Sequence, residues 1–235
     1  RLDPEGLLLA SIMAKKKAVN ASHVLIDIPL GKGAKIESRK EARRLKRRFL
    51  ELGKDLNIKV KVIVTNGNQP IGNGVGPNLE ARDVLNVLMG KGPIDLREKA
   101  IKMAIIILKM LKARNAKRKV LDALNSGRAY EKMKEIIKAQ KGVIFRPEQL
   151  KLGKFRKNIH SNKNGRVTEV NNIDVSKIAR TAGAPQDKTA GIYLCKKLKD
   201  NVKKGEILFI VYSDSQKRLE YASELIKERN PYVIS

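Results

Sequence analysis

The stretch Gly31-Lys32-Gly33-Ala34-Lys35 combines the residue types that bind an anion in a backbone loop. Glycines let the backbone approach a ligand closely, and lysines add positive charge beside backbone amides that point outward. A predicted strand, residues 23–30, runs directly into this stretch, and a predicted helix follows it. The order of strand, glycine loop and helix therefore predicts an anion-binding loop.

Three further residues whose side chains could bind a ligand or transfer a proton lie in a predicted helix before that strand. Asp3 precedes Pro4, a pair that is typical of a helix start, where a carboxylate lies near the positive end of the helix. Ser11 and Lys15 are four residues apart and therefore share one face of the helix. The residues alone leave two interpretations open: a group of ligand-binding side chains, or an N-cap, an incidental serine and a solvated basic last turn.

The elements that would position these residues indicate an α/β sheet. Residues 23–29 are nearly all apolar, except for Asp27, which suits a strand covered on both faces in a parallel or mixed sheet. Residues 59–65 form a second predicted strand, which continues into a long glycine-rich loop, 66–77, and another helix. Repetition of strand, glycine loop and helix places ligand-facing loops at the carboxyl ends of the strands. Two such loops at one sheet edge favour a functional role over a flexible connector.

Neither loop has a standard nucleotide-binding signature. The glycines at 72, 74 and 76 have the wrong spacing for a dinucleotide fingerprint, and no GKS or GKT sequence follows. The helix after the first loop begins at a capping box formed by Ser38 and Glu41. Its basic segment, residues 39–48, is expected to be a solvated polar face.

The remaining chain divides into helices and then strands. Residues 93–141 are predicted to be helical, with Ile94–Ala113 buried, and residues 145–165 are typical of a linker. The tail is predicted to contain three strands, a helix and a short final strand, with the strands at residues 166–171, 191–198 and 206–213 and the helix at 216–229. The predicted fold class is α/β, with a mixed, mostly parallel sheet flanked by helices, followed by a smaller β-rich α+β C-terminal domain.

Three domain segments are predicted. Residues 1–18 form a helix of a helical domain whose remainder is missing, residues 19–155 form the central α/β domain, and residues 156–235 form the C-terminal domain. The turn of residues 201–208 resembles a hairpin of barrel-sandwich carrier domains, but it lacks their modified lysine flanked by methionines. This region is therefore expected to be structural.

The composition indicates anionic partners. The chain has 51 Lys+Arg against 24 Asp+Glu, for a net charge of +27, which favours nucleic acids first among possible partners. Aromatic residues make up only 4% and tryptophan is absent, so platforms for base stacking are not evident. Enrichment in charged residues is equally typical of life at high temperature.

Cysteine and histidine usage limits the other possibilities. Lone Cys195 cannot form an intrachain disulfide, and a reduced, buried thiol in a cytoplasmic protein is expected. No apolar run approaches the roughly 20 residues of a membrane span, and no signal peptide is evident. No metal is implied, because the two histidines and the cysteine are far apart.

Several segments in order resemble the thymidine and pyrimidine-nucleoside phosphorylase family, and most closely its archaeal branch, the AMP phosphorylases. They are LLLASIMAKK, VLIDIPLGKGAK, TNGNQPIGNGVGPNLEARDVL, AQKG, and the tail from GRVTEVNN to GEILFIVYS, which together cover essentially the whole chain. The resemblance implies a pentosyltransferase that cleaves an N-glycosidic bond with inorganic phosphate. It implies no cofactor, and a homodimer whose helical domain closes on the α/β domain.

The resemblance also implies roles for individual residues. Asp3 would lie where the archaeal branch has its proton donor, and Ser11 and Lys35 where that branch contacts the nucleotide. Lys15 matches the lysine that contacts the base carbonyl in the pyrimidine enzymes. The family's phosphate-binding glycine loop and its substrate arginine would lie before Arg1, so this chain alone is expected to be inactive.

Three interpretations follow from the sequence. The first is phosphorolysis of a nucleoside 5′-monophosphate, with AMP and phosphate giving adenine and ribose 1,5-bisphosphate. The thymidine branch typically has an apolar residue at the position of Lys35, so Lys35 favours a nucleotide substrate over the alternative, a thymidine or pyrimidine-nucleoside phosphorylase. The third, a basic nucleic-acid-binding protein, depends on the net charge alone, and nucleic acid is therefore not the partner that the sequence favours.

Overall fold

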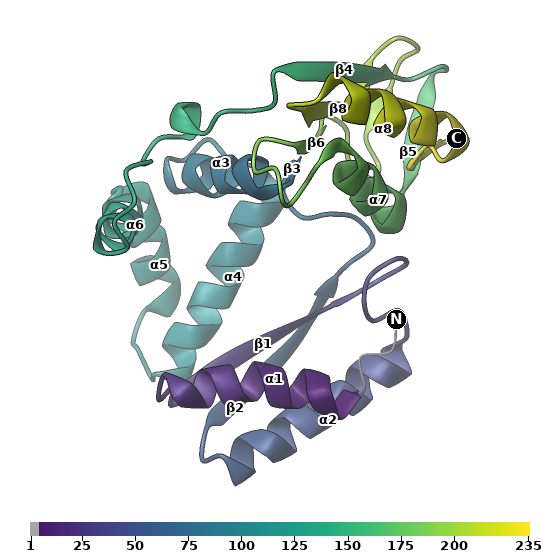
Figure 1. Cartoon of the computed structure of the whole chain (residues 1–235). Coiled ribbons are helices and arrows are strands. Elements are labelled where there is room, and N and C mark those ends of the chain that lie inside the picture. Colours follow the sequence, from purple (N-terminus) through teal and green to yellow (C-terminus); the bar gives the residue numbers. More distant parts are fainter. Residues whose placement is uncertain (1–4) are drawn as a thin grey trace. The chain divides into compact units, whose positions relative to one another are not determined.

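The computed structural model describes residues 5–235, which form two compact units (Figure 1). Unit 1 comprises the described residues up to Gly67 together with Ile101–Val120, and unit 2 comprises Asn68–Ala100 and Leu121–Ser235. Helices α4 (Ile94–Met110) and α5 (Ala116–Asn125) each contribute residues to both units. The domain boundaries predicted from the sequence at 18/19 and 155/156 stay predictions.

Unit 1 is built around one strand-helix-strand unit. Its elements are α1 (Glu5–Ala18), β1 (His23–Leu30), α2 (Arg39–Asp55) and β2 (Lys59–Asn66). The strands pair in parallel, from His23 opposite Lys59 to Leu30 opposite Asn66. A parallel pair needs a crossover connection, and α2 supplies it, as the sequence predicted.

The packing of unit 1 follows from two periodicities. Alternate residues of β1 are buried, and α2 buries residues three and four apart, so that both contribute to one apolar cluster with α1. At Gly53 the helix comes so close to the second strand that a Cβ atom would lie 2.5 Å from Cγ2 of Val60. Ser38 caps helix α2, and its hydroxyl accepts a hydrogen bond from the amide of Glu41 at 3.1 Å, so the N-cap half of the predicted capping box is confirmed.

Unit 2 contains the remaining elements. They are β3 (Gly74–Val75), α3 (Pro77–Leu88), α6 (Arg128–Ala139), the 3₁₀ turn η1 (Pro147–Gln149), β4 (Phe155–His160), β5 (Gly165–Val170), α7 (Asn172–Ala182), β6 (Gly191–Leu194), β7 (Asn201–Val202), β8 (Ile207–Ser213), α8 (Gln216–Glu228) and β9 (Tyr232–Ile234). The strands form an antiparallel sheet in the order β3-β6-β8-β4 and a second in the order β7-β5-β9.

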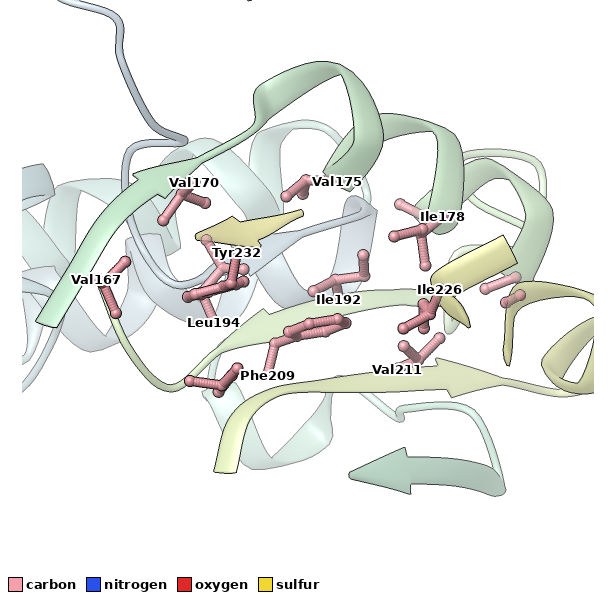
Figure 2. Packing of buried hydrophobic residues seen from close by; sticks show 14 of the residues in the cluster. Val167, Val170, Val175, Ile178, Ile192, Leu194, Phe209, Val211, Ile226 and Tyr232 are labelled. Atoms are coloured by element: carbon pink, nitrogen blue, oxygen red, sulfur yellow. The ribbon is translucent and has the colours of Figure 1, made fainter. Parts of the chain in front are cut away.

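The core of unit 2 lies among these two sheets and helices α7 and α8 (Figure 2). The aromatic rings of Phe209 and Tyr232 stack with centroids 5.5 Å apart, which joins one strand of each sheet. The Tyr232 hydroxyl donates to the backbone carbonyl of Lys196 at 2.5 Å. An apolar body with a satisfied polar tip is how tyrosine contributes to a core at little cost.

The predicted mixed α/β class is confirmed, but the expectation of a mostly parallel sheet is not. Among the described strands, parallel pairing joins β1 to β2, whereas the named strands of unit 2 pair antiparallel. The second predicted strand-loop-helix unit leads into a two-residue strand, β3, which pairs antiparallel with β6. The glycine-rich loop therefore ends in a sheet of different construction.

Three local predictions are wrong. Residues 145–165 are not simply a linker, because they contain η1 and the edge strand β4. Helix α4 has no buried residue, and Ile94 is 72% exposed, so an apolar sequence was insufficient to predict burial. Cys195 is exposed rather than buried, because it follows the last residue of β6. Within residues 5–235, no helix has the length and apolar character needed to cross a bilayer.

Candidate functional site

The carboxyl ends of β1 and β2 form the platform for the basic loop, Gly31–Lys35. Leu30 and Asn66 lie opposite each other at this edge, and the amide of Gly67 donates to the carbonyl of Leu30 at 2.9 Å. Within the strands, just before this edge, the Thr65 hydroxyl donates to the Asp27 carboxylate at 2.8 Å. This bond explains the acidic residue in an otherwise apolar strand, since it links the two strands just before the loop.

The basic loop is a closed turn. The amide of Gly31 donates to the carbonyl of Ile36 at 3.2 Å, and the amide of Ala34 donates to the carbonyl of Gly31 at 3.1 Å. Gly33 has a φ of +72°, a left-handed conformation that favours glycine, and its amide donates to the Glu37 carboxylate at 2.9 Å. The backbone amides of all three residues thus have partners within the loop and its flank.

This arrangement corrects the sequence-based picture of the loop. An anion cradle made of outward-pointing amides is not formed by Gly31, Gly33 and Ala34, because the turn uses them. The groups that extend from the loop are instead the side chains of Lys32 and Lys35, which are both exposed. The loop is therefore better suited to presenting a lysine ammonium group than to enclosing an anion with backbone amides.

Helix α1 carries the other predicted residues of unit 1. Leu9 and Met13 are buried in the apolar cluster, whereas Ser11 and Lys15 are exposed on another face of the helix. The Ser11 hydroxyl donates to the carbonyl of Leu8 at 3.2 Å. Asp3 lies outside the described residues. Ser11, Lys15 and Lys35 thus share one unit and are all accessible from solvent.

The second glycine loop, Asn68–Gly76, is held from within unit 2. The carboxylate of Asp83, which is 4% exposed, accepts the amides of Asn73 at 2.6 Å and Gly74 at 2.7 Å. A carboxylate that accepts hydrogen bonds from two backbone amides holds that part of the loop in one conformation. The loop is therefore neither a flexible connector nor a cradle with spare amides at these two positions.

Lys197 and Leu198 hold the same loop from the other side. The Lys197 ammonium donates to the carbonyl of Pro70 at 2.7 Å and to that of Gly72, and it lies 3.1 Å from the Asp95 carboxylate. The Leu198 amide donates to the Gln69 side chain at 2.7 Å. Sequence reasoning missed these contacts, since more than a hundred residues separate the partners and no motif links them.

The site has no metal centre among the residues described, where His, Cys, Asp and Glu side chains form no group of three or more that could hold an ion. The chemistry available at unit 1 is that of ammonium and hydroxyl groups beside a rigid strand edge. Such groups bind phosphate and carbonyl oxygens.

Comparisons with known proteins define the class. Residues 166–233 match the family model described as the pyrimidine nucleoside phosphorylase C-terminal domain. This range contains β5 through the middle of β9, and hence most of the core of unit 2. The chain is thus related to the nucleoside phosphorylases.

The matches that cover nearly the whole of this chain are more specific. The AMP phosphorylase of Pyrococcus furiosus is 49% identical over 99% of this chain, and those of Methanocaldococcus jannaschii and Methanococcus vannielii are 44% and 40% identical over 99% and 98%. The chain is a homologue of the AMP phosphorylases. It spans about half of their length, 46 to 47%.

Proposed function

We propose that this chain takes part in the phosphorolysis of a nucleoside 5′-monophosphate, in which AMP and phosphate give adenine and ribose 1,5-bisphosphate. The observation that carries the proposal is the similarity to AMP phosphorylases along nearly the whole chain. The substrates are then a nucleoside monophosphate and inorganic phosphate, without a cofactor. Assembly as a homodimer and a division into domains at 18/19 and 155/156 are parts of the same proposal.

The reaction assigns a task to each predicted residue. A phosphate oxygen bonds to C1′ of the ribose while the bond from C1′ to the base nitrogen breaks, and the base departs with the electron pair. Departure is easier when the base receives a proton, which we assign to the carboxylic acid of Asp3. Lys35 would bind the 5′-phosphate, and Ser11 and Lys15 would contact the nucleotide and its base.

The geometry of unit 1 is compatible with these roles. Lys35 extends from a turn whose backbone is fixed by three amide hydrogen bonds, so its ammonium starts from a defined position. Ser11 and Lys15 are exposed on α1, on residues four apart. A lysine on a rigid loop binds a phosphate as a point charge.

A chimera tests the reaction. The chain would be fused to the portion of the Pyrococcus furiosus relative that it does not match, and adenine release from AMP would be followed by chromatography with and without phosphate. We expect release only with phosphate, and none from the chain alone. An Asp3→Asn chimera should lose at least about a hundredfold in kcat. Normal turnover by that variant would exclude Asp3 as the proton donor.

A second candidate is phosphorolysis of a pyrimidine nucleoside, which is favoured by the match of residues 166–233 to the C-terminal domain of pyrimidine nucleoside phosphorylases. Offering the chimera AMP, CMP, UMP, uridine and thymidine in parallel separates the candidates. Nucleotide cleavage in preference to the nucleosides supports the first candidate, and the reverse preference supports the second.

A further inference from the structure

Helix α2 has two faces of opposite character. One face is apolar and buried against the strands of unit 1, through Ala42, Leu45, Phe49 and Gly53. The rest of its first ten residues presents seven exposed basic side chains, Arg39, Lys40, Arg43, Arg44, Lys46, Arg47 and Arg48. We call these seven residues the cationic face. Between positions 39 and 48, Glu41 is the one acidic residue.

The cationic face is unfavourable for the helix itself. Residues 39 and 43, and residues 43 and 47, are like-charged pairs four residues apart. Like charges at this spacing on a helix surface repel each other and destabilise the helix. Arg39 and Lys40 also lie in the first turn, where the helix dipole disfavours positive charge. The intrinsic energetics of α2 thus favour a bound anion along this face.

Helices α6 and α8 pair basic residues with acidic ones. On α6, Lys134 lies 2.7 Å from Glu131, and on α8, Lys227 lies 2.9 Å from Glu224. On α2 the Arg47–Glu51 pair is longer, at 3.8 Å, and both side chains are more than half exposed. The cationic face of α2 therefore differs in character from the charged faces of α6 and α8.

We propose that the cationic face of α2 binds the phosphate backbone of duplex nucleic acid, independently of base sequence. The face is about 14 Å long, at 1.5 Å per residue, and B-form DNA carries one phosphate per about 1.7 Å of its axis. Phe49 is 2% exposed, so α2 offers no aromatic ring for stacking on unpaired bases. Leu50, at 36% exposed, is the most exposed large apolar side chain of α2, and this exposed area is insufficient to insert into a membrane.

The test is fluorescence anisotropy of the whole chain with a labelled duplex of about 20 base pairs, over about 50 to 200 mM salt. Contact with about four phosphates predicts a slope of log K against log salt of about −4. The variant R39Q/R43Q/R47Q should bind at least about tenfold more weakly near 0.1 M salt, with the slope reduced by about 2 to 3. Glutamine is a good helix former, so the fold should be kept, and far-UV circular dichroism verifies this.

A matched variant controls for net charge. R128Q/R156Q/R180Q also removes three positive charges, from exposed arginines of unit 2, and it should keep the affinity within about a factor of two and the slope within about 0.5. Equal weakening by both variants would show that charge alone attracts the duplex, and would overturn the proposal. An absence of duplex binding, or tighter binding to a single strand of the same length, would overturn it too. None of these outcomes depends on adenine release.

Discussion

The buried carboxylate of Asp83 accepts the backbone amide of Gly74 at 2.7 Å, and the same oxygen accepts the amide of Asn73. Asp83→Ala should lower the free energy of unfolding by about 3 to 5 kcal/mol, because it leaves two amides without a charged acceptor. Urea denaturation of unit 2, followed by near-UV circular dichroism, measures the loss. Glu80→Ala is the control, since Glu80 accepts the Gly76 amide but is exposed, and it should cost under about 1 kcal/mol.

The close approach of α2 to β2 predicts that Gly53→Ala destabilises unit 1. Its Cβ atom would lie 2.5 Å from Cγ2 of Val60 and 3.0 Å from the carbonyl oxygen of Ile58. We expect a loss of about 1 to 3 kcal/mol, measured by thermal unfolding. Gly6→Ala in α1 is the matched change, because nothing lies within 4 Å of its Cβ position, and it should stabilise by about 0.5 to 1 kcal/mol. Equal effects of both variants would contradict the packing argument.

Because the Tyr232 hydroxyl is buried, we expect the chain to lose stability at high pH. Burial raises the pKa of its hydroxyl, with smaller contributions from the nearby Cys195 and Asp200. The unfolded chain therefore ionises at Tyr232 before the folded chain does, so this stabilisation is complete below about pH 10 and is lost as the pH rises further. Tyr232→Phe should unfold with a weaker pH dependence above pH ~9.5 than the parent chain.

A second tyrosine serves as the control for that measurement. Tyr221 is 55% exposed, so Tyr221→Phe should leave the alkaline profile unchanged. Guanidinium midpoints at a series of pH values would show the difference. Parallel profiles for the parent and Tyr232→Phe chains would rule out ionisation of Tyr232 as a cause of alkaline unfolding.

Substitution of Lys35 should impair the chimera described above with AMP but not with adenosine. Lys35→Ala should raise KM for AMP by about ten- to a hundredfold, the equivalent of about 1.4 to 3 kcal/mol for a charge-assisted contact to the 5′-phosphate. Cleavage of adenosine, which lacks that phosphate, should change little. Lys32→Ala, an exposed lysine of the same loop, is the control. An equal loss with adenosine would argue against recognition of the phosphate by Lys35.

Local patterns predicted unit 1 well. The apolar run of β1, the capping serine at 38 and the spacing of Ala42, Leu45 and Phe49 are all set by neighbouring residues, so they could be recognised from sequence. Placing Lys35 on a loop after a strand was possible for the same reason. The hydrogen bonding of the loop amides could not be predicted. The amides of Gly31 and Gly33 donate to the Ile36 carbonyl and the Glu37 carboxylate, and residue types alone do not indicate these partners.

Unit 2 was harder because its order depends on distant partners. Strand β4 reads as a linker because it is an edge strand with basic, exposed residues and pairs with β8 alone. Helix α7 escaped prediction although Asn171 caps it and Gly183 ends it, signals that could have located it. The contacts of Lys197 with Pro70 and Gly72 join residues more than 120 positions apart, which no local pattern reports.

The position of β3 in its sheet limits the order in which the strands of unit 2 can assemble. Residues 74 and 75 complete the edge of a sheet whose other strands come from residues 155–213. During synthesis these residues leave the ribosome long before β6. They can pair only after β6 has been made, and contacts between segments so far apart in sequence form slowly. Once β6 has formed, its edge at Ile192 and Tyr193 lies open to pairing with another chain until β3 docks, so a chain that lacks residues 74 and 75 is expected to aggregate.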